Sequence, residues 1–222
     1  MPDARNVAFT FITIVVIPLL FFVLLELGLT VAGVGTSYDY FHEIDIDGQP
    51  HYQENSDFAD QFYPASLDIK PRENTFAVER RPEVIRVFIL GGSAALGFPH
   101  KNHGLDRLLA AQLRAALPSR EIEVINTAMT SVNSHVVYAV AKSIPEDSAD
   151  FAVILMGNNE VVGPYGPGTL DENFLENITL IRGIQALKRT RTWQALNSLI
   201  LQIRPTDAMQ ELEWEGMQMF TN

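Results

Sequence analysis

The chain of 222 residues contains no cysteine. This absence excludes disulfide bonds, thiolate metal sites and anchoring through a lipid-modified cysteine. It leaves the redox compartment open, because secreted proteins can also lack cysteine. Basic residues are scarce as well: 16 Lys and Arg stand against 27 Asp and Glu, for a formal net charge of −11 at pH 7. An acidic chain is poorly suited to the phosphate backbone, so we expect no nucleic acid as its main partner.

Charged residues are absent from Val7–Leu25, which reads VAFTFITIVVIPLLFFVLL. About twenty apolar residues suffice to cross the hydrocarbon core of a bilayer. The segment therefore predicts a transmembrane helix with the lipid bilayer as its partner, and Pro18 is compatible with a kinked one. A signal peptide is the alternative, because Val31-Ala32-Gly33 supplies small residues for cleavage. The long apolar stretch favours an uncleaved anchor over residues 1–35.

Basic residues are distributed unevenly around this segment. Arg5 precedes it, and the next basic residue is Lys70. The positive-inside rule then predicts a cytoplasmic N-terminus. We expect a single-pass membrane protein whose C-terminal body lies outside the cytoplasm, on the periplasmic or outer face.

Residues 36–80 form an acidic juxtamembrane segment, with ten acidic against three basic residues and many aromatics. The aromatics argue against a purely disordered linker. Phe41–Ile46, then Asp47-Gly48, then His51-Tyr52 predict a hairpin with a tight turn, although Pro50 weakens the second strand. The same acidic stretch faintly resembles a calcium loop, but the remaining ligand positions are absent, and we expect no metal site.

From Glu83 onward, short apolar runs alternate with helical patterns, which predicts an α/β domain with a parallel sheet and right-handed crossovers. The expected strands are Val84–Leu90, Glu121–Asn126 and Phe151–Met156, and the expected helices are Gly104–Leu117 and Asn133–Ile144. Ser131 or Asn133 is expected to cap the second helix.

The strand pattern ends at Gly157, and only helical patterns follow. They cover Asn173–Leu187, Trp193–Ile203 and Asp207–Asn222. A basic run, Lys188-Arg189-Thr190-Arg191, separates the first two. It either contacts anionic lipid or is a solvated helix end.

Polar clusters follow all three expected strands: Ser93, Asn126-Thr127-Ala128 and Gly157-Asn158-Asn159-Glu160. Parallel strands present their carboxyl ends at one edge, so the clusters should meet around one crevice. There Ser93 can supply a nucleophilic oxygen. The N–H near Ala128, the Asn159 amide and the Ser93 N–H can stabilise an oxyanion. The alternatives are a serine that caps a helix and asparagines that turn the chain.

These clusters resemble the motif blocks of the SGNH (GDSL-type) hydrolases. Gly91–Gly97 reads GGSAALG and is similar to G-D-S-x-x-x-G, with Gly92 replacing the aspartate. Asn126-Thr127-Ala128 has alanine where the second block has glycine. Gly157–Glu160 is similar to G-x-N-D, with a final glutamate. The strings NTAMTSVNSHVV and GNNEVVGPYGPGT resemble a membrane-anchored bacterial branch, some of whose members carry tetratricopeptide repeats.

This resemblance implies a flavodoxin-like sheet within residues 81–222 and hydrolysis or transfer of an acyl ester, carried on a glycan or a lipid. It implies that Ser93 is the nucleophile and that Ala128 and Asn159 donate to the oxyanion. It implies no cofactor.

The family's general base, from a D-x-x-H near the C-terminus, has no counterpart here. No histidine follows His135. His100, His103 and His135 are more typical of surface or capping residues, and Asp39-Tyr40-Phe41-His42 precedes the sheet. With the small number of strands, this suggests the N-terminal part of a longer enzyme. The alternative is an inactive, membrane-tethered binding or scaffold protein, so enzymatic activity stays open.

Overall fold

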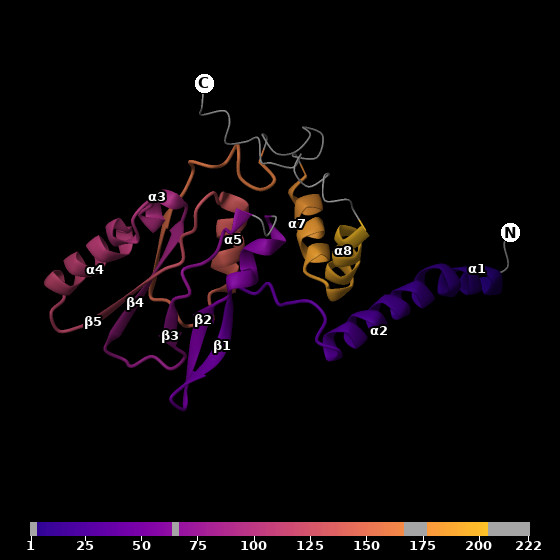
Figure 1. Cartoon of the computed structure of the whole chain (residues 1–222). Coiled ribbons are helices and arrows are strands. Elements are labelled where there is room, and N and C mark those ends of the chain that lie inside the picture. The colour runs from indigo at the N-terminus through magenta and orange to yellow at the C-terminus, as the bar shows by residue number, and fades with distance from the viewer. Residues whose placement is uncertain (1–3, 64–66, 167–176, 204–222) are drawn as a thin grey trace, which may run out of the picture. The chain divides into compact units, whose positions relative to one another are not determined.

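The computed structural model describes residues 4–63, 67–166 and 177–203. They divide into two compact units (Figure 1). One contains residues 4–37 together with 182–203, and the other is Tyr38–Ile181. The chain is therefore a mixed α/β protein with an apolar N-terminal helix.

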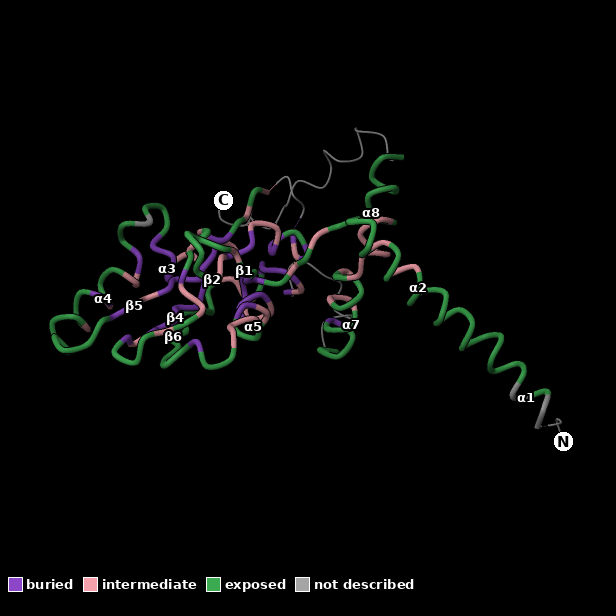
Figure 2. Tube along the Cα trace, turned by 90° about the horizontal axis from the view of Figure 1, so that it is seen from below, coloured by how far each residue is buried: buried purple, intermediate pink, exposed green. Residues whose placement is uncertain are grey.

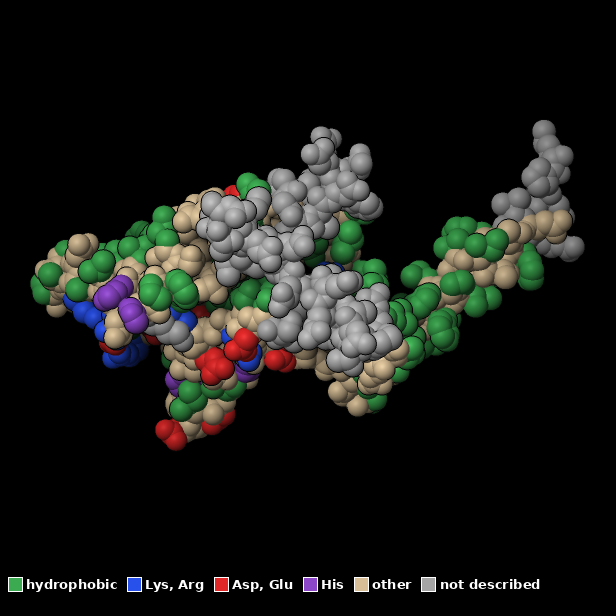
Figure 3. Space-filling view, turned by 45° about the horizontal axis from the view of Figure 1, so that its top comes forward, with side chains coloured by type: hydrophobic (Ala, Val, Ile, Leu, Met, Phe, Trp, Pro, Cys, Tyr) green, Lys and Arg blue, Asp and Glu red, His purple; other side chains and the backbone are tan. Residues whose placement is uncertain are grey.

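The N-terminal helix consists of α1 (Ala4–Phe11), a π-helical turn (Ile12–Val16) and α2 (Ile17–Val31). Phe9–Val31, 23 residues long, is apolar enough to cross a membrane, and hydrophobic side chains cover it (Figure 3). Pro18 lies in the first turn of α2, directly after the π-helical turn. Proline has no N–H to bond to the preceding turn, and a local π-helical adjustment is one way for an apolar helix to accept it.

Two helices near the C-terminus, α7 (Ile178–Lys188) and α8 (Arg191–Ile203), confirm the helical patterns on either side of the basic run. The expected start at Asn173 lies outside the described residues, as does the whole expected helix Asp207–Asn222.

The second unit begins with an antiparallel sheet of β1 (Phe41–Ile46), β2 (Gln49–Glu54) and β3 (Thr75–Ala77). The predicted hairpin is confirmed. Asp47 and Gly48 both have positive φ, at 53° and 78°, as a tight two-residue turn requires. The Asp45 carboxylate accepts a hydrogen bond from the Gly48 N–H at 2.8 Å, so this acid serves the turn.

A parallel sheet follows, made of β4 (Val84–Gly91), β5 (Glu121–Asn126) and β6 (Phe151–Leu155) in the order β5-β4-β6. The connecting helices are α3 (Ser93–Leu96), α4 (Leu105–Ala116) and α5 (Ser134–Ser143). All three predicted strands and both predicted helices are confirmed to within a residue or two.

The core lies on both faces of β4, because alternate side chains of a strand point to opposite faces. On one face Ile89 packs with Ala95, Leu96 and Leu109, from α3 and α4. On the other face Phe88 and Leu90 belong to a larger cluster with the valines of α5.

Aromatic residues from 36–80 complete this larger cluster. Phe76 and Phe41 lie edge-on to Phe88, with ring centroids 5.4 and 6.1 Å away, and Tyr40 and Phe58 are fully buried beside them. Each such aromatic pair contributes about 0.5–1.5 kcal/mol beyond its buried area. From Tyr38 onward, residues of this acidic segment therefore share one unit and one core with the parallel sheet. Figure 2 shows the buried residues concentrated around β4.

Candidate functional site

The turn that carries Ser93 depends on two glycines at the end of β4. A Cβ on Gly91 would lie 2.0 Å from the Leu155 carbonyl oxygen, so only glycine lets the end of β6 approach this closely. Gly92 is extended and takes the N-cap position, which leaves Ser93 as the first residue of α3. Ser93 is half-buried. The alternative of Ser93 as the helix cap is therefore wrong, because Gly92 occupies that position and no side chain caps α3.

No histidine among the described residues is hydrogen-bonded to Ser93. Within the described part of the chain, no hydrogen bond is formed by the Ser93 hydroxyl. His100 and His103 are exposed and lie edge-to-face with each other at 5.9 Å, and His135 on α5 lies 5.8 Å from the Tyr165 ring. His42 is exposed on β1.

Asn126 ends β5 and organises the second cluster. Its side chain is 2% exposed and donates to the Ala95 carbonyl at 2.9 Å and to the Asp106 carboxylate at 2.7 Å. Its Oδ1 accepts the Ala128 N–H at 3.0 Å. Ala128 was expected to offer this N–H to a substrate oxyanion. The N–H is already used, because an asparagine readily bonds the backbone two residues onward.

Asn159 meets the Ser93 turn from the third cluster. A Cβ built on Gly92 would lie 3.5 Å from Asn159 Nδ2 and 3.7 Å from the Val132 carbonyl oxygen. The Asn159 amide is half-buried and donates to that carbonyl at 3.1 Å. An amide has two N–H groups, so this bond leaves one donor. The first and third predicted clusters therefore lie side by side, as the sheet topology led us to expect.

Glu160, the acid of the third cluster, caps α5. Its carboxylate accepts the Ser134 N–H at 3.0 Å and the Ser134 hydroxyl at 2.6 Å. Asn133 occupies the N-cap position, as predicted, but its side chain does not cap the helix and instead donates to the Pro164 carbonyl at 2.8 Å. Ser131 lies outside the cap position. The side-chain cap of α5 was predicted to come from a neighbouring residue, but it comes from the distant Glu160.

A buried polar network behind the turn was not predicted from the sequence. Asp106, at the start of α4, receives the Arg72 guanidinium at 3.3 Å as well as the Asn126 amide. Arg72 also donates to the Leu96 carbonyl of α3. Asp106 and Arg72 thereby tie together α3, α4 and the end of β5, the three elements that place the Ser93 turn.

The same network continues to Glu54, which is 1% exposed. Its carboxylate accepts the N–H and the side-chain amide of Asn74, both at 3.0 Å, and Asn74 also donates to the Asn126 carbonyl at 3.0 Å. Burial raises the pKa of Glu54 despite these hydrogen bonds. Burial and the nearby Glu54 charge raise the pKa of Tyr40 well above its ordinary value. These residues span 40 to 126, so no local sequence pattern could have revealed them.

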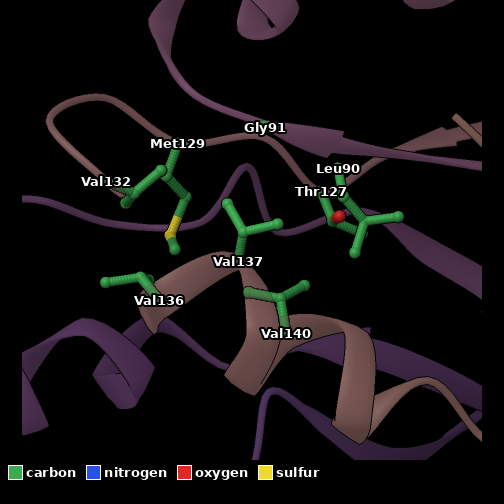
Figure 4. Close-up of a pocket in the computed structure, with 8 residues that line it drawn as sticks. All are labelled: Leu90, Gly91, Thr127, Met129, Val132, Val136, Val137 and Val140. Atoms are coloured by element: carbon green, nitrogen blue, oxygen red, sulfur yellow. The ribbon is translucent and has the colours of Figure 1, made fainter. Parts of the chain in front are cut away.

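A small apolar pocket lies beside the strand ends, between β4 and α5 (Figure 4). It encloses about 160 Å³, part of it open to solvent, and is lined by Leu90, Gly91, Thr127, Met129, Val132, Val136, Val137 and Val140. Most of these residues belong to the main core, and the space is too narrow for a water molecule. It is a packing gap and offers no polar group for chemistry apart from Thr127.

A metal site is not found among the described residues: no three His, Asp or Glu side chains there are placed to hold a metal ion.

Comparisons with protein-family models, with curated proteins and with solved structures found no match. The strand ends therefore carry the chemistry that this chain offers: a half-buried serine on a glycine turn, close to an asparagine amide that retains one N–H.

Proposed function

We propose that the chain belongs to a membrane-anchored ester hydrolase or acyltransferase of the SGNH type, acting on an acyl ester carried on a glycan or a lipid. One observation supports the proposal most. The Gly92–Ser93 turn and the Asn159 amide meet at the carboxyl edge of a parallel sheet, with Asn159 Nδ2 3.5 Å from the position of a Gly92 Cβ. The β5-β4-β6 order is also compatible with a flavodoxin-like sheet.

In the proposed reaction, the Ser93 oxygen attacks the ester carbonyl carbon, and a base must take the serine proton. The free N–H of Asn159 and the backbone N–H of Ser93 would stabilise the oxyanion, and each such donor is worth about 10²–10³ in rate. Ala128 can join them only if Asn126 releases its N–H. A positioned base contributes about 10²–10⁴, so we expect slow turnover unless a histidine reaches Ser93.

Imidazole added to the purified chain tests this arrangement, because it can stand in for a missing histidine. The chain in detergent is assayed on p-nitrophenyl acetate with and without imidazole, beside Ser93→Ala. We expect an imidazole-dependent rate above that of Ser93→Ala at the same imidazole concentration. Equal rates for the two proteins would contradict a nucleophilic Ser93. A Ser93-dependent rate without imidazole would place a base within these residues.

A non-catalytic binding or scaffold protein is the second candidate. It is favoured by the Ala128 N–H, which is already bonded to Asn126, and by the lack of a described histidine partner for Ser93. Saturable binding of a glycan or peptide that is unchanged in Ser93→Ala, together with no imidazole-dependent turnover, would support this candidate.

We also propose that the uncharged segment Val7–Leu25 of the N-terminal helix spans the membrane, with a cytoplasmic N-terminus and the remaining chain outside. The asymmetry of basic residues supports this orientation. A reporter active only outside the cytoplasm, fused after Asn222, should be active. Activity of a cytoplasm-only reporter at the same position would contradict the orientation.

A further inference from the structure

Glu26 is the only charged residue of α2, and it has a specific partner. Its carboxylate accepts the Arg191 N–H at 2.6 Å, the Thr192 N–H at 2.9 Å and the Thr192 hydroxyl at 2.8 Å. These N–H groups belong to the first turn of α8, where a helix has no internal acceptors and carries partial positive charge. Glu26 therefore caps α8 from the apolar helix.

A second pair of bonds holds the same helix. Gln194 accepts the Thr36 N–H at 2.8 Å and donates to the Thr36 carbonyl at 3.1 Å. The half-buried residues of α2 are Leu25, Glu26 and Leu29, while the rest of α2 is exposed. The first turns of α8 are thus fastened to the C-terminal end of α2.

The position of Glu26 fixes the depth of α8 if the helix spans a bilayer. The uncharged segment Val7–Leu25 extends about 28 Å as a helix, which nearly matches a hydrocarbon core of about 30 Å. Glu26 follows this segment immediately and would lie at the boundary between acyl chains and headgroups. Because Glu26 caps α8, the helix would begin at that boundary.

The outward surface of α8 suits such a boundary. Leu196, Leu199, Ile200 and Ile203 follow the i, i+3, i+4, i+7 spacing of one helix face, and all are exposed. Asn197, Ser198 and Gln202 lie between them, together with one exposed apolar residue, Leu201. Trp193, a residue type enriched at membrane interfaces, begins the same face. Three cations, Lys188, Arg189 and Arg191, precede it.

We propose that α8 is an interfacial membrane helix: its stripe Leu196, Leu199, Ile200 and Ile203 enters the outer acyl region beside the span, and its basic end meets anionic headgroups. A lipid surface is the occupant that these features favour, because Glu26 holds the stripe next to the span and the cations match anionic lipid. The proposal rests on the span of Val7–Leu25 that is proposed above.

The absence of cysteine allows a clean test by site-directed spin labelling of the full chain. Single cysteines replace residues 195 to 203 in turn, and the chain is reconstituted in vesicles of phosphatidylcholine with phosphatidylglycerol. Collision rates with oxygen, which concentrates in lipid, and with a water-soluble nickel complex are measured. We expect a periodic pattern along α8, with the oxygen preference greatest at Leu199→Cys and Ile200→Cys and the nickel preference greatest at Ser198→Cys.

Two control positions separate the possible failures. Val23→Cys reports on the span, and Leu108→Cys, exposed on α4 of the other unit, should collide with nickel throughout. Lipid contact at Val23→Cys with no periodicity along α8 would overturn the inference about α8 alone. Water contact at Val23→Cys would overturn the span and the inference together. Shielding of the stripe from both reagents would show a protein partner there, which also overturns the proposal.

Discussion

Strands β4 and β6 are neighbours in one sheet, paired in parallel from Val87↔Phe151 to Gly91↔Leu155, and both are almost entirely apolar. Yet seven of the eight residues of β4 are buried, whereas four of the five residues of β6 are exposed and Val153 is half-buried. Figure 2 shows the same contrast along the two strands. Two strands that look alike in sequence therefore have opposite environments.

Covering layers cause this difference. β4 has β5 and β6 on its two edges, α3 and α4 packed on one face, and α5 with the aromatics of the antiparallel sheet on the other. Among the described strands, β6 pairs only with β4, and its exposed Ile154 and Leu155 contribute to neither core cluster. Burial is thus a property of what packs on a strand rather than of the strand's own composition.

The largest expected effect comes from making the same substitution, isoleucine to alanine, in each of the two strands. Ile89→Ala, at a fully buried position of β4, should lower the free energy of unfolding by about 2–5 kcal/mol. Ile154→Ala, at a position 56% exposed on β6, should change it by roughly 0.5 kcal/mol. Urea unfolding followed by circular dichroism in detergent measures both. Equal losses would mean that β6 is covered in solution.

Replacing Asn126, which ends β5, should mainly affect stability, whereas replacing Asn159, which follows β6, should mainly affect the reaction rate. Asn126→Ala leaves the Asp106 carboxylate and the Ala128 N–H without this partner and should cost about 1–3 kcal/mol of stability. Asn159→Ala removes one bond from a half-buried amide and should cost less. In an active form of the protein, however, Asn159→Ala should lower the rate about 10²–10³-fold. An unchanged rate would exclude Asn159 from the mechanism.

The exposed face and edge of β6 should promote association. An apolar strand with an unpaired edge is a template for pairing with another chain. We expect concentration-dependent oligomers in sedimentation velocity, and Ile154→Lys should shift them toward monomer because a charge on an edge strand opposes pairing. Leu108→Lys, which changes an exposed leucine on α4, is the matched control and should leave the distribution unchanged. Equal shifts for both variants would remove β6 from the interface.

The smallest expected effect is a pH dependence of the free energy of unfolding, which comes from the buried Glu54 at the end of β2. Burial raises the folded-state pKa of Glu54 above its ordinary value of 4.5, so the folded protein holds this proton more tightly than the unfolded chain. The associated stability is complete below about pH 4.5 and is lost as the pH rises through the folded-state pKa. Relative to Glu54→Gln, which does not titrate, the wild type should lose stability between pH 4 and neutrality. A constant difference would contradict the raised pKa.

Local patterns predicted the parts of the fold that depend on neighbouring residues. The Asp47-Gly48 turn, the apolar run of β4 that ends at Gly91, and the helical spacing of α4 all require only short-range chemistry, and each is confirmed. The first and third polar clusters also approach each other, at Gly92 and Asn159, because the ends of parallel strands share one edge.

Long-range partners decided the rest. Ser134 receives its cap from Glu160, and the Asn126 side chain is anchored by Asp106. Neither partner is visible in a local pattern, because a polar side chain takes whichever buried partner the fold brings within reach.

By itself, the sequence determined the apolar N-terminal helix, the strand–helix alternation and the edge at which the polar clusters end, because composition and periodicity act locally. Only the tertiary structure decided that aromatic residues of the acidic segment complete the core, that Arg72 and Asp106 support the Ser93 turn, and that Glu26 caps α8. These outcomes depend on contacts between residues far apart in the chain, whose burial and hydrogen bonds exist only once the chain has folded.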